Sequence, residues 1–92
     1  MEGTNSINKR IREFVLGHFP LARKKSITDG DALLDEGIID SLGVLDLVNF
    51  IEGEFKISIS DEDLIPENFQ SIECIAFFID KKRKRFIEAS RR

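Results

Sequence analysis

Three segments of the chain repeat apolar residues at the spacing of an α-helix, and only one short stretch alternates as a β-strand does. The helical segments lie in residues 7–19, 41–55 and 72–79. The alternating stretch, Lys56–Ile59, has no second strand candidate with which to pair, and an isolated strand is not stable. We therefore expect an all-α fold in which this stretch is an extended connector.

The first helical segment ends at a proline and leads into a long connection. Phe19-Pro20 stops the helix, because the residue before a proline is pushed out of the α region. We expect residues 20–40 to pack on the core, because they include four large aliphatic side chains: Leu33, Leu34, Ile38 and Ile39. A short helical turn is expected at Asp31–Asp35.

Capping residues define the other helices. Asp40 and Ser41 both suit the start of the second long helix, since their side-chain oxygens can accept hydrogen bonds from free backbone N–H groups. Ser71 suits the start of the last helix in the same way. Ser60 precedes three acidic residues, which the helix dipole favours in a first turn, and this pattern predicts a short third helix that Pro66 closes.

Charge is unevenly distributed along the 92 residues. Residues 29–73 contain thirteen acids and one base, whereas bases outnumber acids six to two before this segment and seven to two after it. An acidic middle favours partners with basic docking surfaces and disfavours nucleic acid. The single cysteine rules out an internal disulfide, and no apolar run is long enough to span a membrane, so we expect a cytoplasmic protein without membrane insertion.

The sequence contains no recognisable set of catalytic or metal-binding residues. His18 is the only histidine, so Ser41 has no evident base that would make it a hydrolytic nucleophile. No glycine-rich phosphate loop is present, and the acid-rich stretch at 29–37 lacks the ligand spacing of a calcium loop. We therefore expect neither an enzyme nor a metal site.

Ser41 can be interpreted in two ways. An Asp-Ser pair at a helix start is most often a helix cap. A serine at this position also suits the attachment of a phosphate group, because the free N–H groups and the positive end of the helix dipole stabilise negative charge. In that case Asp40 could orient a modifying enzyme, and the acidic helix that follows could dock on basic patches.

The segment "GIIDSLGVLDLVNFIEGEF" resembles the acyl carrier protein family, the phosphopantetheine-attachment domains. Asp40-Ser41-Leu42 matches the Asp-Ser-Leu motif of that family. The resemblance extends backwards through "DALLDEG" and forwards through "ISDEDLIPENFQSIECIAFFI", so it covers roughly residues 7–82.

This resemblance implies a four-helix bundle with a long loop between the first two long helices and a short third helix. A single carrier domain at residues 1–85 would be followed by a basic tail at 86–92. A phosphopantetheinyl transferase would attach 4'-phosphopantetheine from coenzyme A to Ser41, and the thiol of that arm would hold acyl groups as thioesters. The chain would be a monomeric carrier, not an enzyme, in fatty acid, polyketide or related specialised biosynthesis.

The same resemblance assigns roles to individual residues. The cofactor site would consist of Ser41 with Asp40 and Leu42. The docking face for the transferase and for the acyl-loading and acyl-processing enzymes would comprise Leu42, Leu45, Asp46, Asn49 and Glu52. The inward face of the same helix would comprise Leu47, Val48, Ile51 and Phe55. A pocket for the acyl chain would be completed by Ile59 and by residues 72–79.

Two alternatives to this acyl carrier stay open: an aminoacyl or peptidyl carrier of the same fold, and an unmodified helical adaptor. Gly43 and Val44 follow the motif where carriers of fatty acid synthesis often have an acid, which favours specialised pathways, including polyketide, aminoacyl and peptidyl carriers. The second alternative is an unmodified helical adaptor that binds a basic partner through its acidic face. Ser41 distinguishes the two, because an adaptor has no need of that residue.

Overall fold

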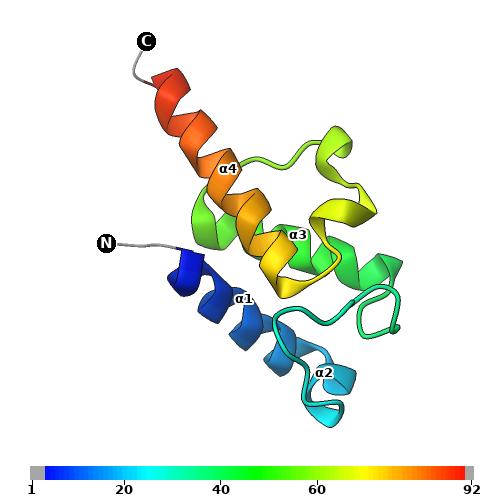
Figure 1. Ribbon diagram of the computed structural model, residues 1–92. Helices are drawn as coiled ribbons and strands as arrows, with labels where there is room; N and C mark the ends of the chain where they lie inside the picture. The colour runs from blue at the N-terminus through cyan, green and yellow to red at the C-terminus, as the bar shows by residue number, and fades with distance from the viewer. Residues whose placement is uncertain (1–3, 91–92) are drawn as a thin grey trace.

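The computed structural model describes residues 4–90, with side chains described from Ser6 to Lys84, and these residues form helices and no strand. The elements in chain order are α1 (Thr4–His18), α2 (Pro20–Lys24), α3 (Ser41–Phe55), the 3-10 turns η1 (Asp61–Asp63) and η2 (Pro66–Asn68), and α4 (Ile72–Ser90). Figure 1 shows α1, α3 and α4 packed together, with the cyan-to-green connection running from α2 to the start of α3. The expected all-α, carrier-like bundle is confirmed.

The core is built from the apolar stripes of the three long helices. Each stripe residue below is at most 6% exposed: Ile7, Ile11 and Val15 in α1; Leu47, Ile51 and Phe55 in α3; Ile72, Ile75, Ala76, Phe78 and Ile79 in α4. Burying one such aliphatic or aromatic side chain contributes about 1.5–3 kcal/mol. Val48, which was expected to point inward, is half-buried. The helical spacing in the sequence therefore identified most of the core.

The long connection contains a helix that the sequence did not reveal. Pro20 starts α2, where its missing N–H is no loss because the first N–H groups of a helix have no partner. In place of the helical turn expected at Asp31–Asp35, overlapping hydrogen-bonded turns lie slightly further along the chain. The Glu36 N–H donates to the Ala32 carbonyl at 3.0 Å, and the Gly37 N–H donates to the Leu34 carbonyl at 3.2 Å. Gly37, at a φ of 71°, ends these turns in a left-handed conformation that suits glycine.

Asp29 fixes the long connection to both α1 and α4. Its carboxylate accepts hydrogen bonds from Asn8 Nδ2 at 3.1 Å and from the Arg12 guanidinium at 3.0 Å. Arg12 also donates to the Ile27 carbonyl at 2.9 Å, and the Glu73 N–H donates to the Asp29 carbonyl at 3.0 Å. The connection therefore packs on the body of the protein, as its aliphatic residues predicted.

The short third helix predicted after Ser60 is instead the pair of 3-10 turns η1 and η2. Asp63 ends η1, and its carboxylate accepts hydrogen bonds from the Ser60 N–H and hydroxyl, both at 3.0 Å. Pro66 then starts η2, and a proline with no N–H to donate prevents one continuous α-helix over this segment. The predicted cap at Ser71 is confirmed, since its hydroxyl accepts from the Cys74 N–H at 3.1 Å.

Helix α4 continues through Ser90, so it runs past residue 85, where the sequence placed the end of the domain. The side chains of the predicted basic tail at 86–92 lie outside the described residues. No helix in the described part of the chain is both long enough and apolar enough to cross a membrane.

Candidate functional site

Ser41 is the first residue of α3, and its side chain is exposed. Asp40 is the N-cap, with an extended backbone, and its carboxylate accepts a hydrogen bond from the Gly43 N–H at 2.8 Å. Of the two capping candidates in the sequence, Asp40 is therefore the residue that caps the helix. The Ser41 hydroxyl lies at the positive end of the helix dipole without serving as the cap.

Gly43 holds the start of α3 against the junction between α1 and α2. A Cβ atom at this position would lie 2.7 Å from Phe19 Cε1 and 3.0 Å from Ile39 Cγ2. A glycine inside a helix costs about 1 kcal/mol relative to alanine, and here close packing requires it. The missing acid after the Asp-Ser-Leu motif thus has a packing cause, because a larger side chain does not fit.

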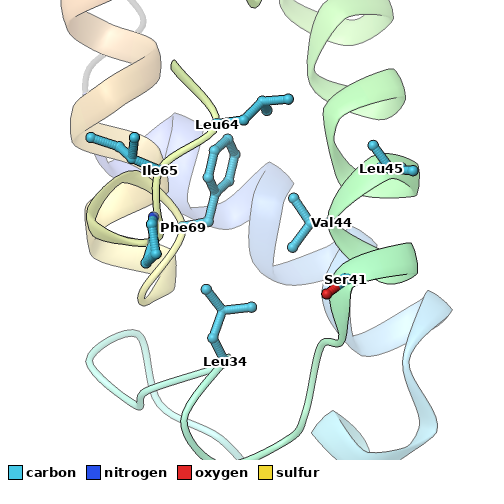
Figure 2. Close-up of a pocket in the computed structure, with 8 residues that line it drawn as sticks. Leu34, Ser41, Val44, Leu45, Leu64, Ile65 and Phe69 are labelled. Atoms are coloured by element: carbon cyan, nitrogen blue, oxygen red, sulfur yellow. The ribbon is translucent and has the colours of Figure 1, made fainter. Parts of the chain in front are cut away.

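A cavity of about 300 Å³ opens beside Ser41. It is lined by Leu34, Ser41, Val44, Leu45, Leu64, Ile65, Pro66 and Phe69. Figure 2 shows Leu34, Val44 and Phe69 pointing into the same space, with the Ser41 hydroxyl at its edge. Ser41 is the only polar side chain of this lining, so the cavity is an apolar space next to an exposed hydroxyl.

The residues predicted to complete the acyl-chain pocket, Ile59 and residues 72–79, are not among those that line this cavity. Ile72, Ile75 and Ile79 are fully buried in the core, and Ile59 packs against the core. That assignment came from the family resemblance, and whether Ile59 and residues 72–79 shelter an acyl chain stays a prediction. The lining residues that it missed include Leu64, Ile65 and Pro66, and the only sequence signal for them is three consecutive apolar residues within an acidic segment.

All five predicted docking residues lie on α3, and four of them are exposed. Leu42 and Leu45 are 73% and 51% exposed, and Asp46 and Asn49 are also exposed. The Glu52 carboxylate instead accepts a hydrogen bond from the Ile59 N–H at 2.8 Å and is half-buried. The structure thus gives Glu52 a role in holding the chain that follows α3.

The His18 ring contacts Asp46 and Phe14 and makes no hydrogen bond to Ser41. Its Nε2 atom lies 3.3 Å from Asp46 Oδ2, and its ring stacks on Phe14 with the two centroids 4.8 Å apart. Among the described residues, no group of three or more His, Cys, Asp or Glu side chains could hold a metal ion. The site therefore offers an exposed hydroxyl at a positive helix end, beside an apolar cavity and exposed apolar and acidic side chains.

The chain is similar to a known family and to proteins that are named as acyl carrier proteins. The family described as "Phosphopantetheine attachment site" matches residues 15–76. The chain is 31% identical to an acyl carrier protein of Buchnera aphidicola subsp. Schizaphis graminum, over 88% of this chain and 99% of that protein. It is 34% identical to an acyl carrier protein homolog of Mycoplasmopsis pulmonis, over 80% of this chain and 97% of that protein. It is 23% identical to the "Probable acyl carrier protein PigG" of a Serratia species, over 82% and 86%.

Proposed function

The chain belongs to the acyl carrier protein family, whose prosthetic group is 4'-phosphopantetheine, and on that premise we propose that Ser41 is the residue that carries this group. Members of this family are carriers that interact with a transferase and with biosynthetic enzymes, and they are not enzymes themselves. The observation that carries the proposal is the division of roles at the start of α3. Asp40 caps the helix, which leaves the exposed Ser41 hydroxyl for attachment.

The residues around Ser41 suit a phosphodiester. Attachment replaces the Oγ–H bond of Ser41 with an Oγ–P bond, while the pyrophosphate of coenzyme A is cleaved, adenosine 3',5'-bisphosphate leaves, and the transferase takes up the proton. The negative charge of the new phosphodiester then stands at the N-terminus of α3, where the helix dipole stabilises it. The bound group supplies a thiol that holds acyl groups as thioesters.

The exposed face of α3 is the proposed docking surface for these enzymes. Leu42 and Leu45 supply apolar contacts there, and Asp46 supplies a negative charge that suits a basic partner surface. Asn49 extends the same face, whereas Glu52 is excluded because it bonds to Ile59. The acidic middle of the chain supports docking onto enzymes with basic surfaces. We propose that the carrier acts as a monomer in the cytoplasm.

The cavity beside Ser41 supports an acyl cargo over an aminoacyl one. Its lining is aliphatic and aromatic apart from Ser41 itself. An ammonium group placed there would lose its water and find no charged partner, whereas an alkyl chain would gain from burial. We therefore favour a carrier of acyl groups in fatty acid or polyketide biosynthesis over an aminoacyl or peptidyl carrier.

The proposal is tested by incubating the protein with coenzyme A, magnesium and a broad-specificity phosphopantetheinyl transferase, followed by intact-mass measurement. The wild type should gain the mass of one phosphopantetheinyl group, and Ser41→Ala should gain none. Ser58→Ala, which alters another exposed serine, is the matched control and should be labelled like the wild type. A folded wild-type chain that gains no mass with several transferases would favour an unmodified adaptor.

A further inference from the structure

Two cavities, here called the first and the second hollow, share part of their wall. The first is the apolar cavity of about 300 Å³ beside Ser41. The second has a volume of about 220 Å³ and is lined by Glu62, Asp63, Ile65, Asn68, Phe78, Lys81 and Lys82. Ile65 lines both hollows, so it forms part of the wall between them.

A pair of aromatic rings completes this wall. Phe69 lines the first hollow and Phe78 lines the second, and their ring centroids are 5.7 Å apart with a tilt of 57°. Phe69 is 2% exposed and Phe78 is 6% exposed, so close packing fixes both rings. In Figure 2 the Phe69 ring stands between Leu64 and Val44 and points into the first hollow.

The two hollows differ in chemistry. The second contains the carboxylate of Asp63 and the ammonium group of Lys82, which form an ion pair at 2.6 Å. An alkyl chain that entered it would remove water from these charged groups without replacing their hydrogen bonds. The apolar space beside Ser41 that is available to a cargo on the attached arm therefore ends at Ile65 and Phe69.

We infer that Phe69 determines cargo length in this carrier, by restricting the sheltered group to short acyl chains whose longer homologues leave their ends in water. The inference rests on the proposed attachment at Ser41. A cavity of about 300 Å³ lies at the lower end of the ~300–1,000 Å³ range of small-molecule sites, which fits a short chain. Phe69 blocks any extension of that cavity towards Phe78.

Contacts with α4 also hold the segment that forms the wall between the two hollows. The ion pair between Asp63 and Lys82 ties the segment from η1 to η2 to α4, and the two side chains are only 20% and 22% exposed. Asn68 Nδ2 donates to the Asp63 carbonyl at 2.8 Å within the same segment. Burial acts to raise the pKa of Asp63, but hydrogen bonds from Lys82 and Ser60 outweigh it and hold the pKa below its usual value. Asp63 therefore stays ionised at neutral pH and keeps this segment against α4.

The experiment loads the protein with butanoyl, hexanoyl, octanoyl or dodecanoyl groups from the corresponding acyl-coenzyme A, with intact mass confirming each product. The rate of thioester cleavage by hydroxylamine then reports how well each chain is sheltered. For the wild type, cleavage should slow severalfold from butanoyl to hexanoyl or octanoyl and slow no further for dodecanoyl. Phe69→Leu should move this plateau to longer chains, because a smaller side chain opens the wall.

Phe77→Leu is the matched control. Phe77 is 63% exposed on α4 and lines neither hollow, so its variant should keep the wild-type plateau. Thermal unfolding confirms that each loaded variant is folded. Protection that keeps rising through dodecanoyl in the wild type, or an unchanged plateau in folded Phe69→Leu, would overturn the inference alone. Failure of any acyl group to attach would instead overturn the proposed function, and this inference with it.

Discussion

Helix α3 places two leucines, two residues apart, in opposite environments. Leu45 is 51% exposed, whereas Leu47 is completely buried. The inward face of the helix, with Leu47, Ile51 and Phe55, holds the fold together. The outward face, with Leu42 and Leu45, leaves apolar surface in water beside Ser41. Exposed apolar side chains that are grouped on one face are typical of a surface that partners cover.

The largest effect on stability should come from comparing leucine-to-alanine substitutions on the inward and outward faces of α3. Leu47→Ala should lower the free energy of unfolding by about 2–5 kcal/mol, because it leaves a cavity in the core. Leu45→Ala should change it by no more than about 0.5 kcal/mol and should instead slow the transferase. Urea unfolding and labelling kinetics measure the two effects. Equal destabilisation by both variants would show that the faces are not distinct.

The two glycines of α3 provide a second comparison between packed and open positions. Gly43→Ala should destabilise the protein by about 1–3 kcal/mol, since the new methyl group collides with Phe19. Gly53→Ala meets nothing within 4 Å and should stabilise the protein by about 0.5–1 kcal/mol through higher helix propensity. Thermal unfolding of the two variants measures this. A stabilised Gly43→Ala variant would contradict the close packing described here.

Substitutions at Asp40 and Ser41 should distinguish the residue that caps α3 from the residue that is modified. Asp40→Ala should cost about 0.5–2 kcal/mol of stability, because the Gly43 N–H loses its acceptor, and the protein should still be labelled at Ser41. Ser41→Ala should leave the unfolding free energy nearly unchanged while abolishing labelling. Chemical denaturation with intact-mass measurement checks both statements. The opposite distribution of effects would make Ser41 the cap.

The smallest expected effects are on transferase kinetics, and they should differ between substitutions of the two acidic residues Asp46 and Glu52. Asp46→Asn should lower transferase kcat/KM by about two- to fivefold at low salt, since an exposed ion pair is worth ~0.2–1 kcal/mol, and salt should reduce the difference. Glu52→Gln should leave kcat/KM close to wild type, because Glu52 is bonded to Ile59. A larger kinetic loss for Glu52→Gln would return Glu52 to the docking face.

Local signals in the sequence were sufficient for the long helices. The stripes of Ile7, Ile11 and Leu47, and the cap at Ser71, depend on residues close in sequence and were predicted correctly. The sequence left the cap of α3 undecided between Asp40 and Ser41, and the structure assigns it to Asp40.

Features that depend on distant contacts were not predictable in this way. The cavity beside Ser41 exists because Leu34, Leu64 and Phe69 reach α3 from two separate connections. Likewise, the reason for Gly43 becomes visible only when Phe19 is seen packed against it. Neither contact leaves a periodic pattern in the sequence.

The most direct test of the central claim is to locate the modification by tandem mass spectrometry of peptides from the transferase-treated wild-type protein. The division of roles between Asp40 and Ser41 predicts that the phosphopantetheinyl group is found on the peptide that contains Ser41, and on that residue alone. A group found on another serine, with Ser41 unmodified in a folded protein, would contradict the account.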